Sequence, residues 1–263
     1  MLSAQLLIGL RMANSQIINL DWMDGLKTLD AESVQSCVTS PPYWGLRDYG
    51  VSGQLGLEKT PEEYVEKMVA GFREVKRVLR KDGTLWLNLG DSYCNAIHGS
   101  KTTKQTVASG VNGTVIENRC VQKKHPILKD KDLVGIPWRV AFALQADGWY
   151  LRQDIIWAKP NPMPESVTDR CTKSHEYIFL LTKSARYFYD NEAIKEPFIT
   201  EPGPLRDKRN ENYGKAFLSP LGKGLRTGYG KNGRNRRSVW SITTHPYKEA
   251  HFATFPQEIP RTC

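Results

Sequence analysis

The residues that follow Val34–Thr39 constrain the fold more than any other feature of this chain. This short strand-like run is followed by Ser40 and then by two consecutive prolines, Pro41 and Pro42. A proline donates no backbone hydrogen bond, so a strand cannot continue its ladder through such a pair. The sequence therefore predicts a strand that leaves its sheet abruptly, with a turn of fixed shape after it.

Strand-like and helix-like runs alternate along the rest of the chain, which is the pattern of an α/β sheet. Thr60 is the predicted N-cap of a helix, with Pro61 at its first position and an apolar face that repeats as far as Leu79. A second helix is expected over residues 133–145, and a short helical turn over 255–259. The predicted strands cover residues 17–20, 34–39, 84–89, 151–157, 176–182, 187–189 and 238–243.

The turn after the first long strand carries groups that suit a nucleobase. In open α/β sheets, ligands bind at the carboxyl ends of the strands. The turn offers the Ser40 hydroxyl, the Pro41 carbonyl and the rings of Tyr43 and Trp44 within a few residues. Such a set can accept hydrogen bonds from an amino group and stack on a planar ring. The alternative is an ordinary Pro-Pro-Tyr loop.

Positive charge is concentrated in one segment. The chain has a net charge of +9, and residues 206–237 contain ten basic and two acidic side chains, so almost all of the excess lies there. A localised basic segment favours a polyphosphate partner, because each neutralised phosphate releases counterions. A solvated basic loop is the alternative. The candidate DNA contacts in this segment are Arg206, Arg209, Lys223, Arg226, Arg234, Arg236 and Arg237.

The cysteines and the apolar runs limit where the protein acts. The five cysteines are widely scattered, without a C-x-x-C pair or metal-ligand spacing, which predicts a reducing compartment and no metal site. No run approaches the roughly 18 apolar residues that a membrane-spanning helix needs. We therefore expect a soluble, cytoplasmic protein with no membrane partner.

The segment from Thr39 to Tyr43 resembles the catalytic motif of the amino-methyltransferases that modify cytosine N4 or adenine N6 in DNA. Residues 17–29, 83–93, 157–190 and 251–259 are similar to other segments of this family, in the order of its permuted beta group. The resemblance implies a Rossmann-like methyltransferase sheet with an inserted basic recognition region. It also implies S-adenosylmethionine as cofactor, double-stranded DNA as substrate, and a bacterial, archaeal or phage source.

The resemblance assigns catalytic roles to Ser40, Pro41, Pro42 and Tyr43. Ser40 and the Pro41 carbonyl would accept the two N–H groups of the amine, and Tyr43 would stack on a base flipped out of the duplex. A serine before the two prolines is typical of N4-cytosine enzymes, and adenine N6 is the alternative. No cysteine follows a proline in this chain, which argues against methylation of a ring carbon.

Candidate cofactor contacts lie near the same predicted sheet edge. Asp21 follows the predicted strand 17–20, whereas Gly90 and Asp91 follow 84–89. Each aspartate could instead form an Asx turn or cap a helix. Three further cofactor contacts come from a segment that resembles the helix covering the methionine end of the cofactor: His251, Phe252 and Phe255.

Two further residues are expected to contact DNA. Trp44 directly follows the catalytic turn, and Lys159 lies in a stretch that resembles the wall beside the base. In the same stretch, Glu176 is expected to support the structure and Trp157 to belong to the core.

The sequence divides into an N-terminal extension (1–16), a catalytic core (17–196) with a loop insertion (95–131), a basic target-recognition region (197–240) and the start of a cofactor-binding segment (241–263). The family continues with a Gly-rich cofactor loop, so a truncated chain with an incomplete sheet and weak cofactor binding is expected. The candidate protein partners are a C-terminal fragment and a cognate restriction nuclease; the oligomeric state stays open. The alternatives are an inactive DNA-binding remnant, and methylation of RNA or of a protein glutamine.

Overall fold

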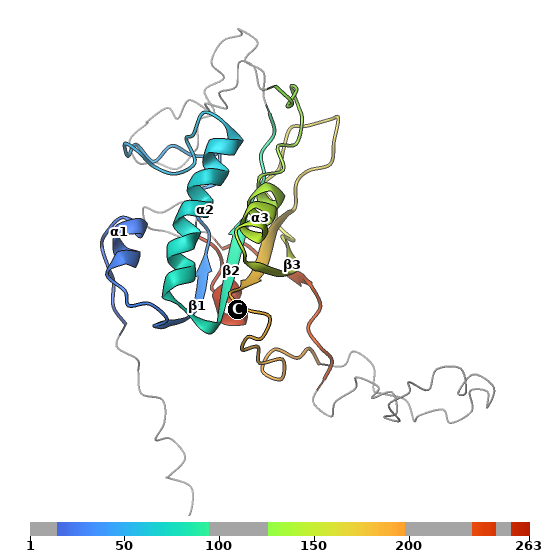
Figure 1. Cartoon of the computed structure of the whole chain (residues 1–263). Helices are drawn as coiled ribbons and strands as arrows, with labels where there is room; N and C mark the ends of the chain where they lie inside the picture. The colour runs from blue at the N-terminus through green and yellow to red at the C-terminus, as the bar shows by residue number, and fades with distance from the viewer. Residues whose placement is uncertain (1–14, 95–125, 198–232, 246–253) are drawn as a thin grey trace, which may run out of the picture.

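The computed structural model describes residues 15–94, 126–197, 233–245 and 254–263. Within these ranges the strands form a five-stranded sheet in the order β1-β2-β4-β3-β5, of which Figure 1 labels β1, β2 and β3. The strands are β1 (Val34–Thr39), β2 (Leu79–Leu89), β3 (Tyr150–Ala158), β4 (His175–Thr182) and β5 (Val239–Ser241). The helices are α1 (Trp22–Lys27), α2 (Pro61–Val78), α3 (Ile136–Ala146) and α4 (Glu258–Thr262).

The strand directions bring several strand ends together at one edge of the sheet. β1 runs parallel to β2 and β5 parallel to β3, whereas β4 is antiparallel to both β2 and β3. Leu89 near the end of β2 pairs with Tyr177, and Ala158 at the end of β3 pairs with His175. The carboxyl ends of four strands and the amino end of β4 therefore share this edge.

Helices α2 and α3 lie side by side over one face of the sheet, as Figure 1 shows. On β2, Leu85, Leu87 and Leu89 point into the core on this face, whereas Trp86 belongs to a second cluster with Trp240 and Ile259 of α4. β2 is buried on both faces, which explains why it is almost continuously apolar from Leu85 onward.

The predicted beginning of α2 is confirmed. The Thr60 side chain accepts a hydrogen bond from the Glu63 amide at 3.1 Å, and Pro61 occupies the first turn, where no donor is needed. The helix buries Tyr64, Met68 and Phe72 along one face. It ends at Val78, and β2 begins at the next residue, earlier than the predicted strand.

Two predicted strands are absent from the described residues. Residues 17–20 form no strand: Ile17 is 94% exposed, and helix α1 begins directly after Asp21. Residues 187–189 are also irregular. Their backbone forms isolated hydrogen bonds rather than a ladder, such as the one from the Phe188 amide to the Asp82 carbonyl at 3.0 Å. Both runs are too short for their residue types to fix a strand without a partner to pair with.

The remaining predicted elements are confirmed with shifted ends. The helix predicted from Leu133 begins at Ile136, and the strand predicted from Ser238 is the three-residue β5. The short final helix starts at Glu258 rather than at Phe255. In the described part of the chain, no helix is both long enough and apolar enough to cross a membrane.

Candidate active site

The turn Ser40–Tyr43 leaves the carboxyl end of β1 and is half-buried. Tyr64 of α2 donates its hydroxyl hydrogen to the Pro42 carbonyl oxygen at 2.9 Å, which ties the turn to the core. The neighbouring Pro41 carbonyl accepts no hydrogen bond from any described residue. The turn thus keeps one free acceptor beside the Ser40 hydroxyl, as the sequence predicts.

The Tyr43 hydroxyl is the centre of a polar network at this edge. It donates to Glu176 Oε2 at 2.6 Å, lies 3.0 Å from Asn88 Oδ1, and accepts from Ser40 Oγ at 3.1 Å. Asn88 in turn donates through Nδ2 to Glu176 Oε2 and to the Tyr177 carbonyl, both at 3.1 Å. The network therefore joins the ends of β1, β2 and β4.

The ring of Tyr43 lies against the backbone at Gly90. A Cβ atom at position 90 would come within 2.6 Å of Tyr43 Cε2, closer than real Cβ atoms approach. Gly90 is expected to contact the cofactor, and in this structure its missing side chain leaves room for the Tyr43 ring. The ring is thus held by packing on one side and by its hydroxyl on the other.

Glu176 is also paired with Lys159. The Lys159 ammonium contacts Glu176 Oε1 and lies 4.4 Å from the centre of the Trp157 ring. Both side chains are mostly buried, with 19% and 15% of their surface exposed. Lys159 was expected to contact DNA; here its charge is balanced inside the site.

Burial and charge shift two ionisable groups in this region. Burial, together with the negative charge of Glu176, raises the pKa of Tyr43 well above its usual value, so the hydroxyl stays protonated at neutral pH. Burial lowers the pKa of Lys173, whose Nζ donates to the Asp91 carbonyl oxygen at 2.9 Å. Lys173 therefore adds a partly desolvated amine beside the end of β2.

Asp91 binds the beginning of α3. Its Oδ1 accepts from the Gly135 and Ile136 amides, each at 3.0 Å, and from the Ser92 amide at 2.9 Å. Gly135 has φ = +77° and no side chain that could cap the helix, so the carboxylate from β2 supplies the cap. Next to it, Ser92 Oγ is buried and has no partner among the described residues.

The other predicted cofactor contacts lie apart from this network. Asp21 is exposed and caps α1 by accepting from the Met23 amide at 2.9 Å, so the helix-cap alternative describes its observed contact. Phe255 packs with the apolar cluster on the sheet face opposite α2. His251 and Phe252 lie outside the described residues.

The expected DNA contact of Trp44 is wrong. The side chain is 3% exposed, belongs to the main core cluster, and donates its indole N–H to the Glu58 carbonyl at 3.0 Å. A ring buried in this way cannot stack on a base. The two aromatic residues of the turn thus diverge, with Trp44 in the core and Tyr43 at the sheet edge.

Three of the predicted DNA-contacting arginines are described, and each has a partner within the chain. Arg234 and Arg237 both pair with Glu196 Oε2, at 3.1 and 2.9 Å, and Arg236 lies 5.0 Å from the centre of the Trp240 ring. Arg237 is 64% exposed, which leaves most of its guanidinium accessible to a phosphate. The other four basic candidates lie outside the described residues: Arg206, Arg209, Lys223 and Arg226.

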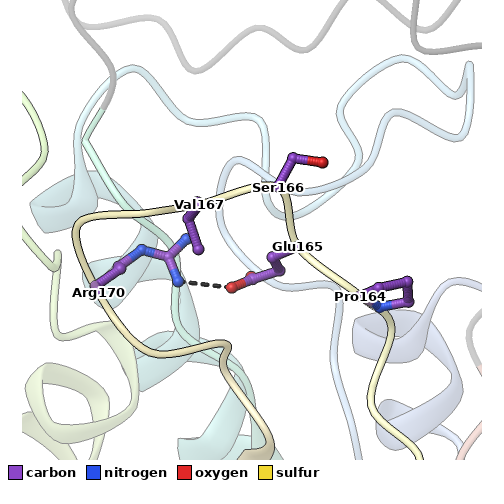
Figure 2. A pocket seen from close by; sticks show the side chains of 5 residues that line it. All are labelled: Pro164, Glu165, Ser166, Val167 and Arg170. Carbon is purple, nitrogen blue, oxygen red and sulfur yellow. Dashed lines mark hydrogen bonds and ion pairs between the residues drawn. The ribbon is translucent and has the colours of Figure 1, made fainter.

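A surface pocket of about 400 Å³ lies in the connection between β3 and β4. Figure 2 shows Glu165 and Arg170 facing each other across this loop, with Arg170 Nη1 2.6 Å from Glu165 Oε2. The Lys173 amide donates to the same Glu165 oxygen at 3.2 Å. The pocket is therefore connected through Lys173 to Asp91 at the sheet edge.

Sequence reasoning missed three residues of this site: Tyr64, Asn88 and Lys173. Asn88 could have been found, because it is a polar residue in an otherwise apolar buried strand, and such groups need hydrogen-bond partners. Tyr64 reads as an ordinary core residue of α2, and Lys173 lies in an irregular loop. Nothing in their sequence spacing indicates the turn or Asp91 as their partners.

Comparison with known proteins identifies a matching family and similar relatives. Residues 34–263 match the N6/N4 methyltransferase family, described as DNA methylase. The type II methyltransferase M.XycI of Xanthomonas campestris pv. cyanopsidis is 46% identical over 251 residues, which cover 95% of this chain and 71% of that protein. The type II methyltransferase M.SmaI of Serratia marcescens is also 46% identical over 251 residues, covering 94% and 73%.

The fold also matches a solved structure. The PvuII DNA methyltransferase (cytosine-N4-specific) superposes with a TM-score of 0.52 at 14% identity, over 90% of this chain and 64% of that one. At this identity the match concerns the fold alone. It confirms the predicted α/β class with a Rossmann-like methyltransferase sheet.

Proposed function

This chain belongs to the N6/N4 family of DNA methylases, and on this premise we propose that it transfers a methyl group from S-adenosylmethionine to the exocyclic amine N4 of cytosine in duplex DNA. The reaction we propose is direct transfer to a flipped-out base at a specific site. The alternative acceptor within the family is adenine N6.

One observation carries this proposal: two hydrogen-bond acceptors lie next to each other in the turn after β1. The Pro41 carbonyl oxygen has no described partner, and Ser40 Oγ gives its hydrogen to Tyr43 and keeps its lone pairs. An exocyclic amine carries two hydrogens and can donate one to each acceptor. The turn therefore fits an amino group.

These two acceptors would make the amine more reactive. The lone pair of an amine on an aromatic ring is delocalised, which makes it a poor nucleophile. Accepting both hydrogens favours the form in which the lone pair lies on nitrogen. The contribution of the protein is positioning and electrostatics, without a covalent intermediate. Ser40 in place of an acidic or amide side chain favours cytosine by its resemblance to N4-cytosine enzymes.

S-adenosylmethionine is the methyl donor of this family, and when bound it supplies a sulfonium methyl group. The end of β2 fits a polar ligand of this kind, because Ser92 Oγ is buried there without a described partner. Ser92 and Asp91 are the residues we expect to face it, together with the Gly90 backbone. The Asp91 carboxylate already accepts three backbone N–H groups, so its contribution is largely to hold this wall in place.

The chain regions follow from the same proposal. We assign residues 17–196 to the catalytic core, 197–240 to target recognition and 241–263 to the start of the cofactor-binding segment. All ten basic side chains between 206 and 237 are arginine or lysine, and glycines are interspersed among them, which suits contact with a phosphate backbone. A cognate restriction nuclease is the partner that the type II relatives suggest.

Labelled methyl transfer tests the proposed function most cheaply. The full chain is incubated with tritiated S-adenosylmethionine and unmethylated genomic duplex DNA, total RNA or a protein mixture. We expect label in DNA alone, and a rate reduced about 100-fold in Ser40→Ala, the scale for one lost preorganised hydrogen bond. Ser52→Ala, an exposed serine in the following loop, is the matched control. Label in RNA or protein instead of DNA would overturn the proposal.

A further inference from the structure

Ser40, Tyr43 and Glu176 form a chain of two hydrogen bonds that leads away from the proposed amine position. Ser40 Oγ lies 3.1 Å from Tyr43 Oη, which lies 2.6 Å from Glu176 Oε2. A serine hydroxyl can donate or accept a hydrogen bond, and the proposed reaction needs it to accept. The direction of these two hydrogen bonds therefore decides which bases the turn can hold.

The partners of Tyr43 fix that direction. An ionised carboxylate only accepts hydrogen bonds, and Asn88 Oδ1, at 3.0 Å, is an acceptor as well. The single hydroxyl hydrogen of Tyr43 therefore goes to one of these two atoms, and the shorter, charged contact with Glu176 is the stronger. Ser40 must then be the donor to Tyr43, which leaves its lone pairs free to accept a hydrogen bond.

The surroundings hold Glu176 in this acceptor role. Lys159 Nζ and Asn88 Nδ2 both donate to its carboxylate, so its charge is balanced and its position is fixed. The raised pKa of Tyr43 keeps the hydroxyl protonated and able to donate. Through the Tyr43 hydroxyl, Glu176 therefore determines the direction in which the Ser40 hydroxyl donates its hydrogen.

We propose that Glu176 is a positioning residue that makes Ser40 an obligate hydrogen-bond acceptor and thereby selects bases with an exocyclic amine. The inference rests on the proposed function, since it specifies how the same turn would recognise its substrate. The exocyclic carbonyl oxygen of a keto base, such as thymine, would meet only lone pairs at Ser40 and Pro41 and would be rejected. An amine meets two acceptors.

The first test needs no catalysis. In the full chain with isotope-labelled tyrosine, the Tyr43 hydroxyl proton should give a slowly exchanging, downfield NMR resonance, assigned by its loss in Tyr43→Phe. Glu176→Gln should move this resonance upfield or abolish it. Glu74→Gln is the matched control, because Glu74 is also a partly buried, ion-paired glutamate but lies on α2 and pairs with Arg77. A resonance that stays in place in Glu176→Gln would overturn the proposal, as would its absence from the wild-type chain.

The second test uses methyl transfer to DNA. Glu176→Gln and Tyr43→Phe should each lower kcat by about 100-fold with little change in KM for DNA, and their combination should be no worse than the poorer single variant, because the two act in series. Glu74→Gln should match the wild type. Additive losses, or a loss confined to KM, would contradict the proposal. If the wild-type chain transfers no methyl group, the proposed function fails, whereas the NMR result still decides the role of Glu176. If Glu176→Gln does not fold, the fall in kcat of Tyr43→Phe tests the same pair of hydrogen bonds.

Discussion

Tyr43 is held more firmly than a stacking ring at the surface of a turn. Its ring occupies the space where a side chain at position 90 would lie, and its hydroxyl has Ser40, Asn88 and Glu176 as neighbours. The sequence predicts the importance of Tyr43 and Gly90 but assigns Gly90 to the cofactor. Only the three-dimensional contact reveals that the glycine makes room for the tyrosine.

Gly90→Ala should therefore damage the site through packing alone. The new Cβ would lie 2.6 Å from Tyr43 Cε2, and the ring cannot move without losing its hydrogen bonds. We expect the free energy of unfolding to fall by about 1–3 kcal/mol, the range for overpacking. Urea denaturation measures this. Gly25→Ala is the control, since its nearest neighbour would lie at an ordinary 3.7 Å; equal stability of the two variants would contradict this explanation.

At the scale of elements, a strand and a helix are joined by one carboxylate. α3 begins at Ile136 after Gly135, which has no side chain to cap it, and Asp91 at the end of β2 accepts from both of these amides. The helix-cap alternative for Asp91 could be predicted from sequence, but the helix it caps could not. The cap acts between residues more than 40 positions apart, whereas capping rules apply to neighbours in sequence.

Asp91→Ala should loosen the β2–α3 connection in the absence of any ligand. Two buried or half-buried amides would lose their acceptor, which costs about 1–3 kcal/mol for each group left unpaired. Hydrogen exchange of the Gly135 and Ile136 amides measures the effect locally. Asp169→Ala, which removes an exposed carboxylate paired with Lys131, is the control. Unchanged protection at residues 135 and 136 would show that Asp91 has no capping role.

At the scale of the whole molecule, the strand topology brings the residues of the candidate site together. The strand ends at one edge bring together residues from positions 40, 88, 159 and 176, which no local pattern connects. The periodic α2 and the buried β2 could be predicted because their own residues determine them. The short runs 17–20 and 187–189 could not, since a strand exists only where a partner pairs with it. The hydrogen bonds of Glu176 depend on the antiparallel register of β4, so they could not be predicted from the sequence either.

The buried acids of the fold should make it less stable in alkaline solution. Burial raises the pKa of the Cys37 thiol to about 11. A group whose pKa is higher in the folded state stabilises the fold fully below its unfolded pKa, roughly 8.5 for cysteine, and this contribution is lost as the pH rises toward the folded value. The free energy of unfolding should thus fall between pH 8 and 11, and the fall should be smaller in Cys37→Ala. Identical pH profiles of the two proteins in urea denaturation would contradict this assignment.

The identity of the methylated nucleoside tests the central claim most directly. Duplex DNA is incubated with the full chain and S-adenosylmethionine, digested to nucleosides and analysed by mass spectrometry against standards. The turn at Ser40–Tyr43 predicts N4-methylcytosine, reduced about 100-fold in Ser40→Ala. N6-methyladenine alone would retain the amine chemistry but contradict the choice of cytosine. Methylation of a ring carbon, or equal product from Ser40→Ala, would contradict the role of this turn altogether.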